Sequence, residues 1–456
     1  MSGVDVDVVV AGAGGGIAGA LRAAELGSRV LLVEASEHFR RGNNTSMSTA
    51  MFPGAGSRWQ RELGIEDSPE IFAGDIRKKT KDSADPLITE TLTNVSAELV
   101  EWMADSQGVD LHLVTDFHYP GHCVDRCHSI AGRKGDRVLS HLLSRVDADA
   151  NIDMLVPARL VDVVGEGPVV TAVVEMPDGS REEIATSAVI MATNGFGANV
   201  DMVQRFIPEI AGAVYHGSDA SRGDAIKIGE HHGASAAFLD AYQGHAALAV
   251  HGSTLAGWAT IMHGAVLVNS EGRRFGDETC GYSEYAAMLA AQPGARGWLI
   301  LDERVHEACL AFRDYQETVE SGALRRADDV AGLAQVLEVE ASVLAETLAA
   351  ADAAARGVSA DEFGRTEFED VLCPPYVAIK VQPALFHTQG GLLVDGNAQV
   401  LRTDGTPVPG LYAAGGAAAG ISGHGADGYL AGNGLLSAFG LSYLAGQAAA
   451  RALQPA

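Results

Sequence analysis

The sequence lacks several features that would place the protein in a membrane or outside the cell. No apolar run reaches the roughly 20 residues that a membrane-spanning helix requires. The N-terminus has no basic stretch like that of a signal peptide, and acidic Asp5 and Asp7 flank its first apolar run instead. The five cysteines, an odd number in a large chain, do not suggest a disulfide framework. These absences predict a reduced, cytoplasmic location and no membrane partner.

Positive charge is also scarce. Lys and Arg total 32 against 59 Asp and Glu, which gives a formal net charge of −27. Nucleic acids and anionic membrane surfaces attract proteins mainly through Lys and Arg. We therefore expect no nucleic-acid partner, and we interpret the acidic excess as a contribution to solubility.

Glycine, by contrast, is abundant. The 54 glycines among 456 residues exceed the average usage of about 7 %. Glycine permits tight turns and close backbone approach to a ligand, so its clusters are informative. A chain of this length is too long for one compact core and suits two domains.

The first 34 residues have the pattern of a βαβ unit. Residues 6–12 predict a buried strand, residues 16–26 a helix rich in small side chains, and the following run a second strand that ends at Glu34. Such a unit predicts a parallel sheet.

The turn between the first strand and the first helix is rich in glycine. It reads Ala11-Gly12-Ala13-Gly14-Gly15-Gly16, a variant of G-x-G-x-x-G with Ile17 at the third glycine position when counted from Gly12. Glycines let the backbone approach a pyrophosphate, and the helix N-terminus favours its charge. Glu34, about 20 residues on, is placed to accept hydrogen bonds from ribose hydroxyls. This context predicts a bound dinucleotide; the alternative is only a tight turn.

The rest of the chain changes character twice. A helical pattern covers residues 88–108, and short strands follow over 153–190. Mixed strands and helices run from about 240 to 370, including a predicted helix at 338–356. Short strands then return, and a helix over 432–453 closes the chain. We therefore predict two parts of a cofactor domain, at 1–240 and 371–456, around an inserted domain at 241–370.

Several short motifs follow in an order that identifies a family. They are Gly42-Asn43-Asn44-Thr45 with Ser46 and Ser48, Arg126-Cys127-His128, Ala192-Thr193-Asn194-Gly195-Phe196-Gly197, Gly223-Asp224-Ala225, Gly272-Arg273-Arg274-Phe275 with Asp277-Glu278, His387-Thr388-Gln389-Gly390-Gly391, and the segment 415–440. Together they resemble the fumarate reductase and 3-ketosteroid dehydrogenase superfamily of FAD enzymes.

This resemblance implies an α/β fold. We expect a discontinuous, Rossmann-like FAD domain of the glutathione-reductase type, with an inserted α+β capping domain. Members with covalent FAD use a histidine in the early Gly-rich segment, where this chain has Asn44 and Thr45, so we expect non-covalent FAD. The residues that resemble FAD contacts are Gly12, Gly14, Gly16, Glu34, Asn44, Thr45, Ser48, Asp224, Gly415, Asn433 and Leu435.

Two arginines of the fumarate-reducing relatives are replaced here. Tyr282 stands where those relatives carry a proton-delivering arginine, and no arginine follows His424-Gly425-Ala426-Asp427 to clamp a substrate carboxylate. Forked guanidinium groups are the preferred partners of carboxylates. Their absence argues against a C4-dicarboxylate substrate.

Ketosteroid dehydrogenases use tyrosines instead, and this chain resembles them there. The resemblance implies that Tyr282 transfers the α-proton, and that Tyr429 polarises a substrate carbonyl with help from the backbone near Gly432 and Gly434. Tyr119, before the Pro120-Gly121-His122 turn, is a further catalytic candidate. The alternative for each tyrosine is a packed aromatic whose hydroxyl bonds to the backbone.

Three further residues are candidates for substrate binding. His387 matches a fumarate-reductase histidine that holds a substrate carboxylate, His245 lies at the junction with the inserted domain, and Arg126 follows the Pro-Gly turn. The histidines could equally be core residues bonded to the backbone. Cys123 and Cys127 with neighbouring histidines lack the spacing of paired ligands, so we expect no metal.

The prediction from sequence is FAD-dependent α,β-dehydrogenation of a ketone or related carbonyl compound, or the reverse ene-reduction. One alternative is a fumarate- or urocanate-reductase-like enzyme for an unsaturated carboxylic acid, held by His387 and Arg126. A second is an electron-transfer flavoprotein subunit. The expected partners are a small-molecule carbonyl substrate and an electron acceptor whose nature the sequence does not identify, because it has no haem motif or second dinucleotide fingerprint.

Overall fold

The computed structural model describes residues 3–119 and 121–453, and the chain divides into two compact units. The first unit comprises Met1–Ile207, Gly217–Tyr242 and His387–Ala456, and the second comprises Pro208–His216 and Gln243–Phe386. The chain returns to the first unit at His387, later than the expected residue 371. The reason is that strand β16 (Tyr376–Thr388) pairs along most of its length within the sheet of the second unit.

The core of the first unit is an eight-stranded sheet. Its strands lie in the order β18-β19-β9-β1-β2-β6, with β8 and β7 continuing from β9. The neighbours of β1, and the pairs β2–β6 and β9–β19, are parallel, whereas β7–β8–β9 and β18–β19 are antiparallel. The bounds are β1 Val6–Ala11, β2 Val30–Val33, β6 Ile152–Leu155, β7 Arg159–Val164, β8 Val170–Glu175, β9 Arg181–Met191, β18 Gln399–Leu401 and β19 Pro407–Ala413. This is the predicted mixed α/β architecture around a parallel βαβ start.

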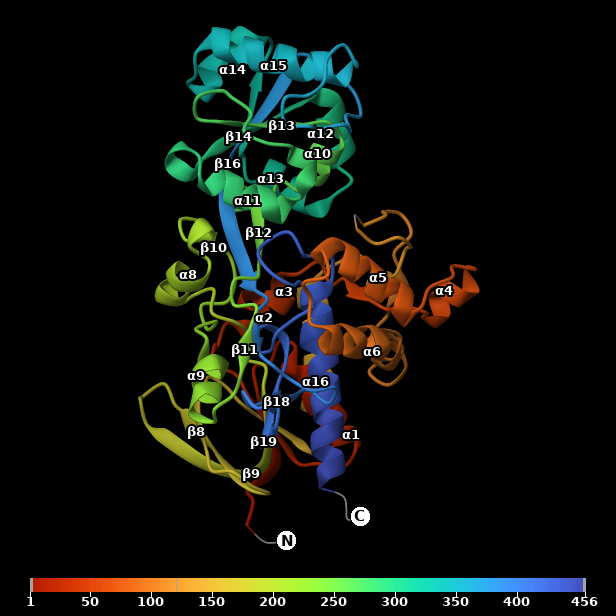
Figure 1. Cartoon of the computed structure of the whole chain (residues 1–456), viewed down its shortest axis with the longest axis vertical. Helices are drawn as coiled ribbons and strands as arrows, with labels where there is room; N and C mark the ends of the chain where they lie inside the picture. The colour runs from red at the N-terminus through yellow and green to blue at the C-terminus, as the bar shows by residue number, and fades with distance from the viewer. Residues whose placement is uncertain (1–2, 120, 454–456) are drawn as a thin grey trace. The chain divides into compact units, whose positions relative to one another are not determined.

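Helices α1 (Gly16–Glu25) and α16 (Asn433–Ala452) pack closely against each other, as Figure 1 shows. Small residues allow this approach, because a Cβ atom at Gly19 would lie 2.6 Å from the Ser442 hydroxyl and one at Gly446 would lie 2.3 Å from the Gly19 carbonyl oxygen. The Gly19 N–H also donates a 3.0 Å hydrogen bond to Ser442 Oγ. The two ends of the sequence thus form one packed layer.

Further helices and short strands complete the first unit. A three-stranded sheet has the order β3-β5-β4, and β11 pairs with β17. The bounds are α2 Phe39–Gly42, α3 Asn44–Met47, β3 Phe52–Pro53, α4 Arg58–Glu62, α5 Pro69–Thr80, α6 Pro86–Asp105, β4 His112–Leu113, β5 Cys127–Ser129, α7 Gly135–Ala148, α8 Val200–Phe206, α9 Asp224–His231, β11 Ala236–Ala237 and β17 Gly391–Leu392.

The second unit is built on a six-stranded sheet in which β16 is central. Strands β10, β12, β14 and β15 all pair with β16, and β13 pairs with β14. The bounds are β10 Val214–Tyr215, β12 Tyr242–Ala249, α10 Ala259–Met262, β13 Val266–Asn269, α11 Tyr282–Ala290, β14 Gly297–Asp302, α12 Glu303–Cys309, α13 Arg313–Glu320, β15 Leu324–Ala327, α14 Val330–Leu337 and α15 Ala341–Ala355.

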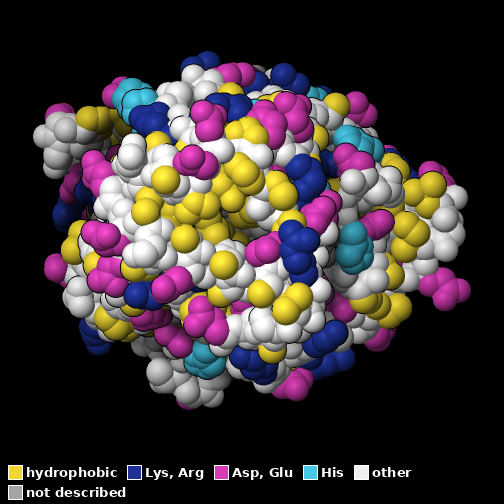
Figure 2. All heavy atoms as spheres, turned by 90° about the horizontal axis from the view of Figure 1, so that it is seen from above, with side chains coloured by type: hydrophobic (Ala, Val, Ile, Leu, Met, Phe, Trp, Pro, Cys, Tyr) yellow, Lys and Arg dark blue, Asp and Glu magenta, His cyan; other side chains and the backbone are white. Residues whose placement is uncertain are grey.

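The distribution of charged side chains on the surface agrees with the scarcity of Lys and Arg in the sequence. On the face shown in Figure 2, acidic side chains are scattered among basic and apolar ones, and no continuous basic field is in view. Among the described residues, no helix combines the length and the apolar character needed to cross a bilayer.

Candidate functional site

The glycine-rich turn forms a close contact between β1, α1 and the end of β9. Gly12 has φ +106°, and a Cβ atom there would lie 2.2 Å from the Ala192 carbonyl oxygen. A Cβ atom at Gly16 would lie 3.0 Å from both Ala192 Cβ and Val10 Cγ1. Gly12 thus permits the tight turn and Gly16 the close packing of helix on strand, although the motif departs from the usual register.

Glu34 follows β2 and turns its carboxylate back to this loop. One carboxylate oxygen accepts a 2.8 Å hydrogen bond from the Ala13 N–H and the other a 2.9 Å bond from the Ser36 N–H. Burial raises the pKa of Glu34, while these backbone donors lower it. The glycine-rich loop and the Glu34 carboxylate are therefore in direct contact, as the dinucleotide-binding fingerprint predicts.

Several buried polar atoms around this loop have no hydrogen-bond partner in the described structure. They are Asn43 Nδ2, Thr193 Oγ1, Ser437 Oγ and both amide atoms of Asn433. Buried polar groups are almost always hydrogen-bonded, so an unpaired set indicates a polar ligand. A Cβ atom at Gly14 would lie 3.1 Å from Thr45 Oγ1 and 3.5 Å from Asn43 Nδ2, which places Asn43 beside the glycine loop. These residues fit a dinucleotide cofactor.

The other predicted cofactor residues have additional partners. Asn44 Oδ1 accepts from Asn194 Nδ2 and from the Ser218 N–H, and Ser48 donates to the Thr45 carbonyl oxygen. Asp224 forms a 2.6 Å ion pair with Arg159. Gly415 has φ +61° and approaches Ala438, and Asn433, Gly434 and Leu435 begin α16.

His387, Tyr429 and Gly434 converge within the first unit. The rings of His387 and Tyr429 have centroids 5.9 Å apart at an interplanar angle of 74°. A Cβ atom at Gly434 would lie 3.0 Å from His387 Nε2 and 3.8 Å from the Tyr429 hydroxyl. Burial raises the pKa of Tyr429 to about 12, although the backbone of Gly434 and Gly432 lowers it. The phenol therefore stays protonated at neutral pH and can donate to a carbonyl oxygen.

His387 has polar neighbours that the sequence analysis did not single out. The Gln389 amide nitrogen lies 3.1 Å from its Nδ1 and 3.5 Å from its Nε2, and Ser422 Oγ donates a 2.9 Å hydrogen bond to Gln389 Oε1. Burial lowers the pKa of His387 to about 4. His387 is therefore a neutral imidazole at physiological pH.

Arg126 differs from its predicted role as a substrate contact. Its side chain is inaccessible to solvent and pairs with the carboxylates of Asp67, at 2.9 and 3.0 Å, and Asp75, at 2.6 Å. Its remaining donors point to His122 Nδ1 at 3.3 Å and Cys123 Sγ at 3.7 Å, and its guanidinium covers the Phe72 ring. All five N–H donors of an arginine are thus engaged inside the protein.

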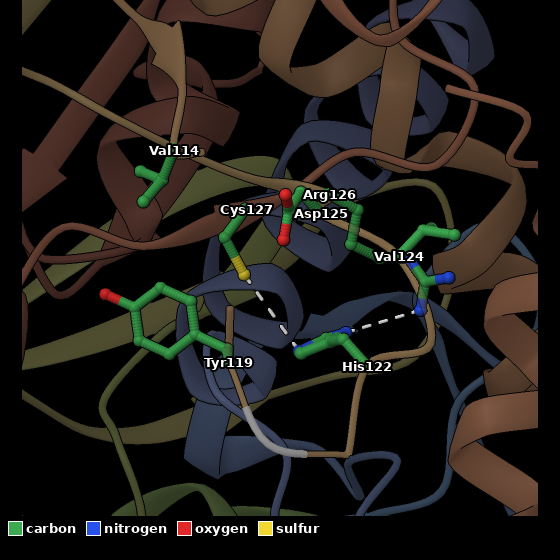
Figure 3. A pocket seen from close by; sticks show the side chains of 7 residues that line it. All are labelled: Val114, Tyr119, His122, Val124, Asp125, Arg126 and Cys127. Carbon is green, nitrogen blue, oxygen red and sulfur yellow. Dashed lines mark hydrogen bonds between the residues drawn. The ribbon is translucent and has the colours of Figure 1, made fainter. Parts of the chain in front are cut away.

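Tyr119 is one of the residues that line a small pocket of the first unit (Figure 3). The other lining residues are Val114, His122, Val124, Asp125, Arg126 and Cys127. Tyr119 packs edge-on against Phe117, with ring centroids 5.0 Å apart. Pro120, which opens the expected turn, lies outside the described residues.

His245 and Tyr282 are brought together in the second unit. Their rings stack with centroids 5.1 Å apart and planes at 20°, and Phe386 also stacks on His245 at 5.6 Å and 20°. The Ala247 N–H donates a 3.0 Å hydrogen bond to His245 Nδ1, so the neutral ring carries its proton on Nε2. Burial, together with a smaller contribution from nearby His216, lowers the pKa of His245 to about 3.

Sequence reasoning missed several of these residues. Asn43, Thr193 and Gln389 lie inside motifs that it recognised, and Ser437 lies in the recognised segment 415–440, so they could have been found there. Phe386 carries no local signal of its role, because only the folded chain brings it to His245.

Comparison with known proteins agrees with this geometry. A family model described as an FAD binding domain matches residues 7–435. The fumarate reductase (cytochrome) of Shewanella frigidimarina is 30 % identical over 454 residues, which cover 98 % of this chain and 77 % of the relative. The open conformation of a flavocytochrome c3 fumarate reductase has a TM-score of 0.85 at 27 % identity, over 98 % of this chain and 79 % of that one.

A second solved structure shares the fold at lower identity. The 3-ketosteroid Δ1-dehydrogenase of Sterolibacterium denitrificans has a TM-score of 0.79 at 20 % identity, over 98 % of this chain and 99 % of that one. With the glycine loop, Glu34 and the unpaired polar set, these findings define an FAD-dependent oxidoreductase that acts on CH–CH groups. The chain belongs to the FAD binding domain family, and fumarate reductases are among its relatives.

Proposed function

We propose that the protein dehydrogenates a ketone or related carbonyl compound at its α,β bond, or catalyses the reverse ene-reduction. The observation that carries this proposal is the charge of the predicted substrate-binding side chains. Arg126 is neutralised by Asp67 and Asp75, and burial holds the pKa of His245 at about 3 and that of His387 at about 4. At neutral pH the two imidazoles are neutral hydrogen-bond donors, and Arg126 has neither a free positive charge nor a free donor.

The absence of a free positive charge on these side chains distinguishes between the two main substrate classes, dicarboxylates and neutral carbonyl compounds. A dicarboxylate is best bound by guanidinium groups, which supply charge and paired donors together. A neutral carbonyl needs donors aimed at the oxygen on which negative charge develops. The protonated phenol of Tyr429 and the neutral imidazoles suit the second case.

The proposed reaction assigns one role to each residue. Tyr282 takes the α-hydrogen as a proton, and the electron pair of that bond forms the new C=C bond while the β-hydrogen leaves as hydride. When bound, FAD supplies the two-electron acceptor for that hydride. Tyr429, with the backbone near Gly432 and Gly434, stabilises the enolate oxygen, and His387 donates a further hydrogen bond. Tyr119 is a proposed auxiliary tyrosine, on the pocket wall that also contains Cys127.

The test is reduction of the flavin by substrate alone. The purified protein is made anaerobic, and the visible absorption of the flavin is followed while saturated cyclic ketones or succinate-like acids are added. Bleaching by a ketone, and its loss in Tyr282→Phe, supports the proposal. Steady reduction of fumarate to succinate by the protein would overturn it.

An unsaturated carboxylic acid is the second candidate substrate, and one observation favours it. The 30 % identity to a fumarate reductase extends over 98 % of this chain, and His387 is the residue that we predict to hold a carboxylate. In that case bleaching requires an acid, and His387→Ala raises the KM for that acid sharply. A flavin that reacts with neither class but is reduced by a protein partner would instead favour an electron-transfer subunit.

A further inference from the structure

His122 lies between a charged network and the segment that carries Tyr429. It is 4 % exposed, and its two ring nitrogens have different partners. Arg126 Nη1 lies 3.3 Å from Nδ1, and the Ala431 carbonyl oxygen lies 3.0 Å from Nε2. Figure 3 shows the imidazole beside Arg126 on one side and Cys127 on the other.

These partners fix the protonation of the ring. An arginine can only donate, so His122 Nδ1 must accept. A carbonyl oxygen can only accept, so Nε2 must carry the proton. His122 is therefore a neutral imidazole with a single permitted tautomer, and a proton on Nδ1 would face a guanidinium.

The network behind His122 is rigid for physical reasons. Asp67 and Asp75 hold Arg126 through three hydrogen bonds of 2.6–3.0 Å, and the Asp75 carboxylate also accepts from the Cys123 N–H at 2.9 Å. A buried guanidinium with two carboxylates in this geometry has little freedom to rotate. His122 thus connects a fixed point in the protein to the Ala431 carbonyl.

Ala431 is two residues from Tyr429 and three from Gly434. The segment packs tightly here, because Gly121 has φ +88° and a Cβ atom there would lie 2.4 Å from Leu430 Cδ2. The Asn433 N–H donates to the Leu430 carbonyl oxygen at 3.1 Å, which joins this segment to the first turn of α16. The position of Ala431 therefore constrains the residues on either side.

We propose that His122 is a positioning residue that holds the Tyr429–Gly434 segment in place through its hydrogen bond to the Ala431 carbonyl oxygen. In that geometry the Tyr429 phenol and the backbone donors face a substrate carbonyl oxygen. Asp67 and Asp75 hold Arg126 in place, and Arg126 in turn fixes the position of His122. The substrate-facing part of this inference rests on the proposed function, whereas the structural part does not.

The experiment compares three substitutions. His122→Gln keeps one donor and one acceptor, His122→Leu removes both at similar volume, and His232→Leu is the matched control. His232 is also buried in the first unit, with Nε2 2.8 Å from the Val163 carbonyl oxygen, but that carbonyl lies in β7. Hydrogen–deuterium exchange over residues 429–434 is the first readout, because it requires no substrate.

We expect at least tenfold faster exchange of residues 429–434 in His122→Leu, near-normal exchange in His122→Gln, and no change there in His232→Leu. Nitrogen NMR of histidine-labelled protein, assigned by the signal missing in His122→Gln, should give the Nε2–H tautomer. With an active substrate, His122→Leu should lower kcat at least tenfold with a smaller change in KM, and His122→Gln should restore most of it.

Unchanged exchange over 429–434 in a folded His122→Leu protein, or an Nδ1–H tautomer, would overturn the positioning role. Failure of the proposed function is distinguishable, because ketones would then not bleach the flavin even though the exchange and NMR results are those expected.

Discussion

The imidazole of His245 lies almost parallel to the phenol ring of Tyr282, with ring centroids 5.1 Å apart and planes at 20°. Because Phe386 also stacks on His245 and the Ala247 N–H fixes its tautomer, the imidazole cannot rotate freely. The orientation of the Tyr282 ring is thus set by aromatic packing within the second unit. A proton-transfer group benefits from such a fixed direction.

Removing the Tyr282 hydroxyl should abolish most of the proton transfer. We expect Tyr282→Phe to lower kcat by roughly 10²–10⁴-fold, the usual contribution of a general acid or base, with little change in KM because the ring still stacks on His245. Steady-state kinetics with the ketone that bleaches the flavin measures this. Tyr285→Phe is the control, since its buried hydroxyl only donates a 3.4 Å hydrogen bond to the Gly276 carbonyl oxygen. Equal losses in both variants would point to a packing role.

Tyr429 should act on the developing enolate rather than on the proton. Loss of one such donor costs about 10²–10³-fold in rate, so Tyr429→Phe should reduce kcat by that factor. The signature is a greatly slowed flavin bleaching with a nearly unchanged binding constant for an unreactive ketone. Tyr443→Phe, which loses a hydrogen bond to Glu98, serves as the control. Wild-type bleaching rates in Tyr429→Phe would remove this residue from the mechanism.

Gly12 should tolerate no side chain. In Gly12→Ala the new Cβ would overlap the Ala192 carbonyl oxygen, so we expect the purified protein to lose FAD and unfold at a lower temperature. Gly27→Ala is a matched comparison, because Gly27 also has positive φ (+92°) but no heavy atom lies within 4 Å of the new Cβ. That variant should cost only the left-handed backbone strain, about 1–2 kcal/mol. The ratio of flavin to protein absorption distinguishes the two; equal ratios would contradict the clash.

Replacing the Asn433 amide by an apolar side chain should stabilise the FAD-free protein but weaken FAD binding. Its buried amide has no partner among the described residues, and an unsatisfied buried polar group costs about 1–3 kcal/mol. We therefore expect Asn433→Leu to raise the unfolding free energy of the FAD-free protein and to weaken FAD binding. Urea unfolding of the FAD-free protein and FAD titration give the two values. A loss in both would mean that Asn433 is a structural residue.

Acid should destabilise the fold partly through His122. Burial and the neighbouring Arg126 charge lower the pKa of His122 from 6.5 to about 4, whereas Asp75 and Asp67 oppose this shift. The unfolded chain takes up this proton as the pH falls below about 6.5, and the folded protein resists until about 4. The unfolding free energy therefore falls with decreasing pH in that window, by at most about 1.4 kcal/mol per pH unit from this one group.

The variant His122→Gln isolates this contribution. It cannot titrate, so the wild-type advantage over it should shrink as the pH falls from 6.5 to 4 and stay constant above 7. Urea unfolding at several pH values measures the difference, and the thiol of Cys127 and the carboxylates of Asp67 and Asp75 remain in both proteins. Parallel curves throughout would show that the folded protein does not lower the pKa of His122.

The nucleotide-binding half of the fold was predictable because its signals are local. The strand at Val6–Ala11, the helix that begins at Gly16 and the carboxylate of Glu34 lie within 30 residues of one another, and each obeys simple periodicity or turn chemistry. The family could be recognised from the short motifs because they, too, are local in the sequence. The return boundary was placed earlier than the structure divides the chain, because β16 is one continuous strand that runs across the change of unit at His387.

The surroundings of the substrate-binding residues were not predictable in the same way. Arg126 was assigned to substrate because a sequence does not show that Asp67 and Asp75 will enclose it. His122 was noted only as part of a turn and as a neighbour of two cysteines, since its carbonyl partner lies 309 residues away. Long-range pairs of this kind depend on the whole fold, and they determine whether a side chain is charged, neutral or already bonded.

The contact of α1 with α16 has a consequence for how the protein is made. Gly19 meets Ser442 across 423 positions of sequence, so the face of α1 that α16 covers has no partner while the chain is still emerging from the ribosome. Asn433 and Ser437, two of the buried polar residues without a hydrogen-bond partner in the described structure, also arrive with α16. The predicted cofactor site is therefore incomplete until α16 has been synthesised, and the covered face of α1 is exposed until then.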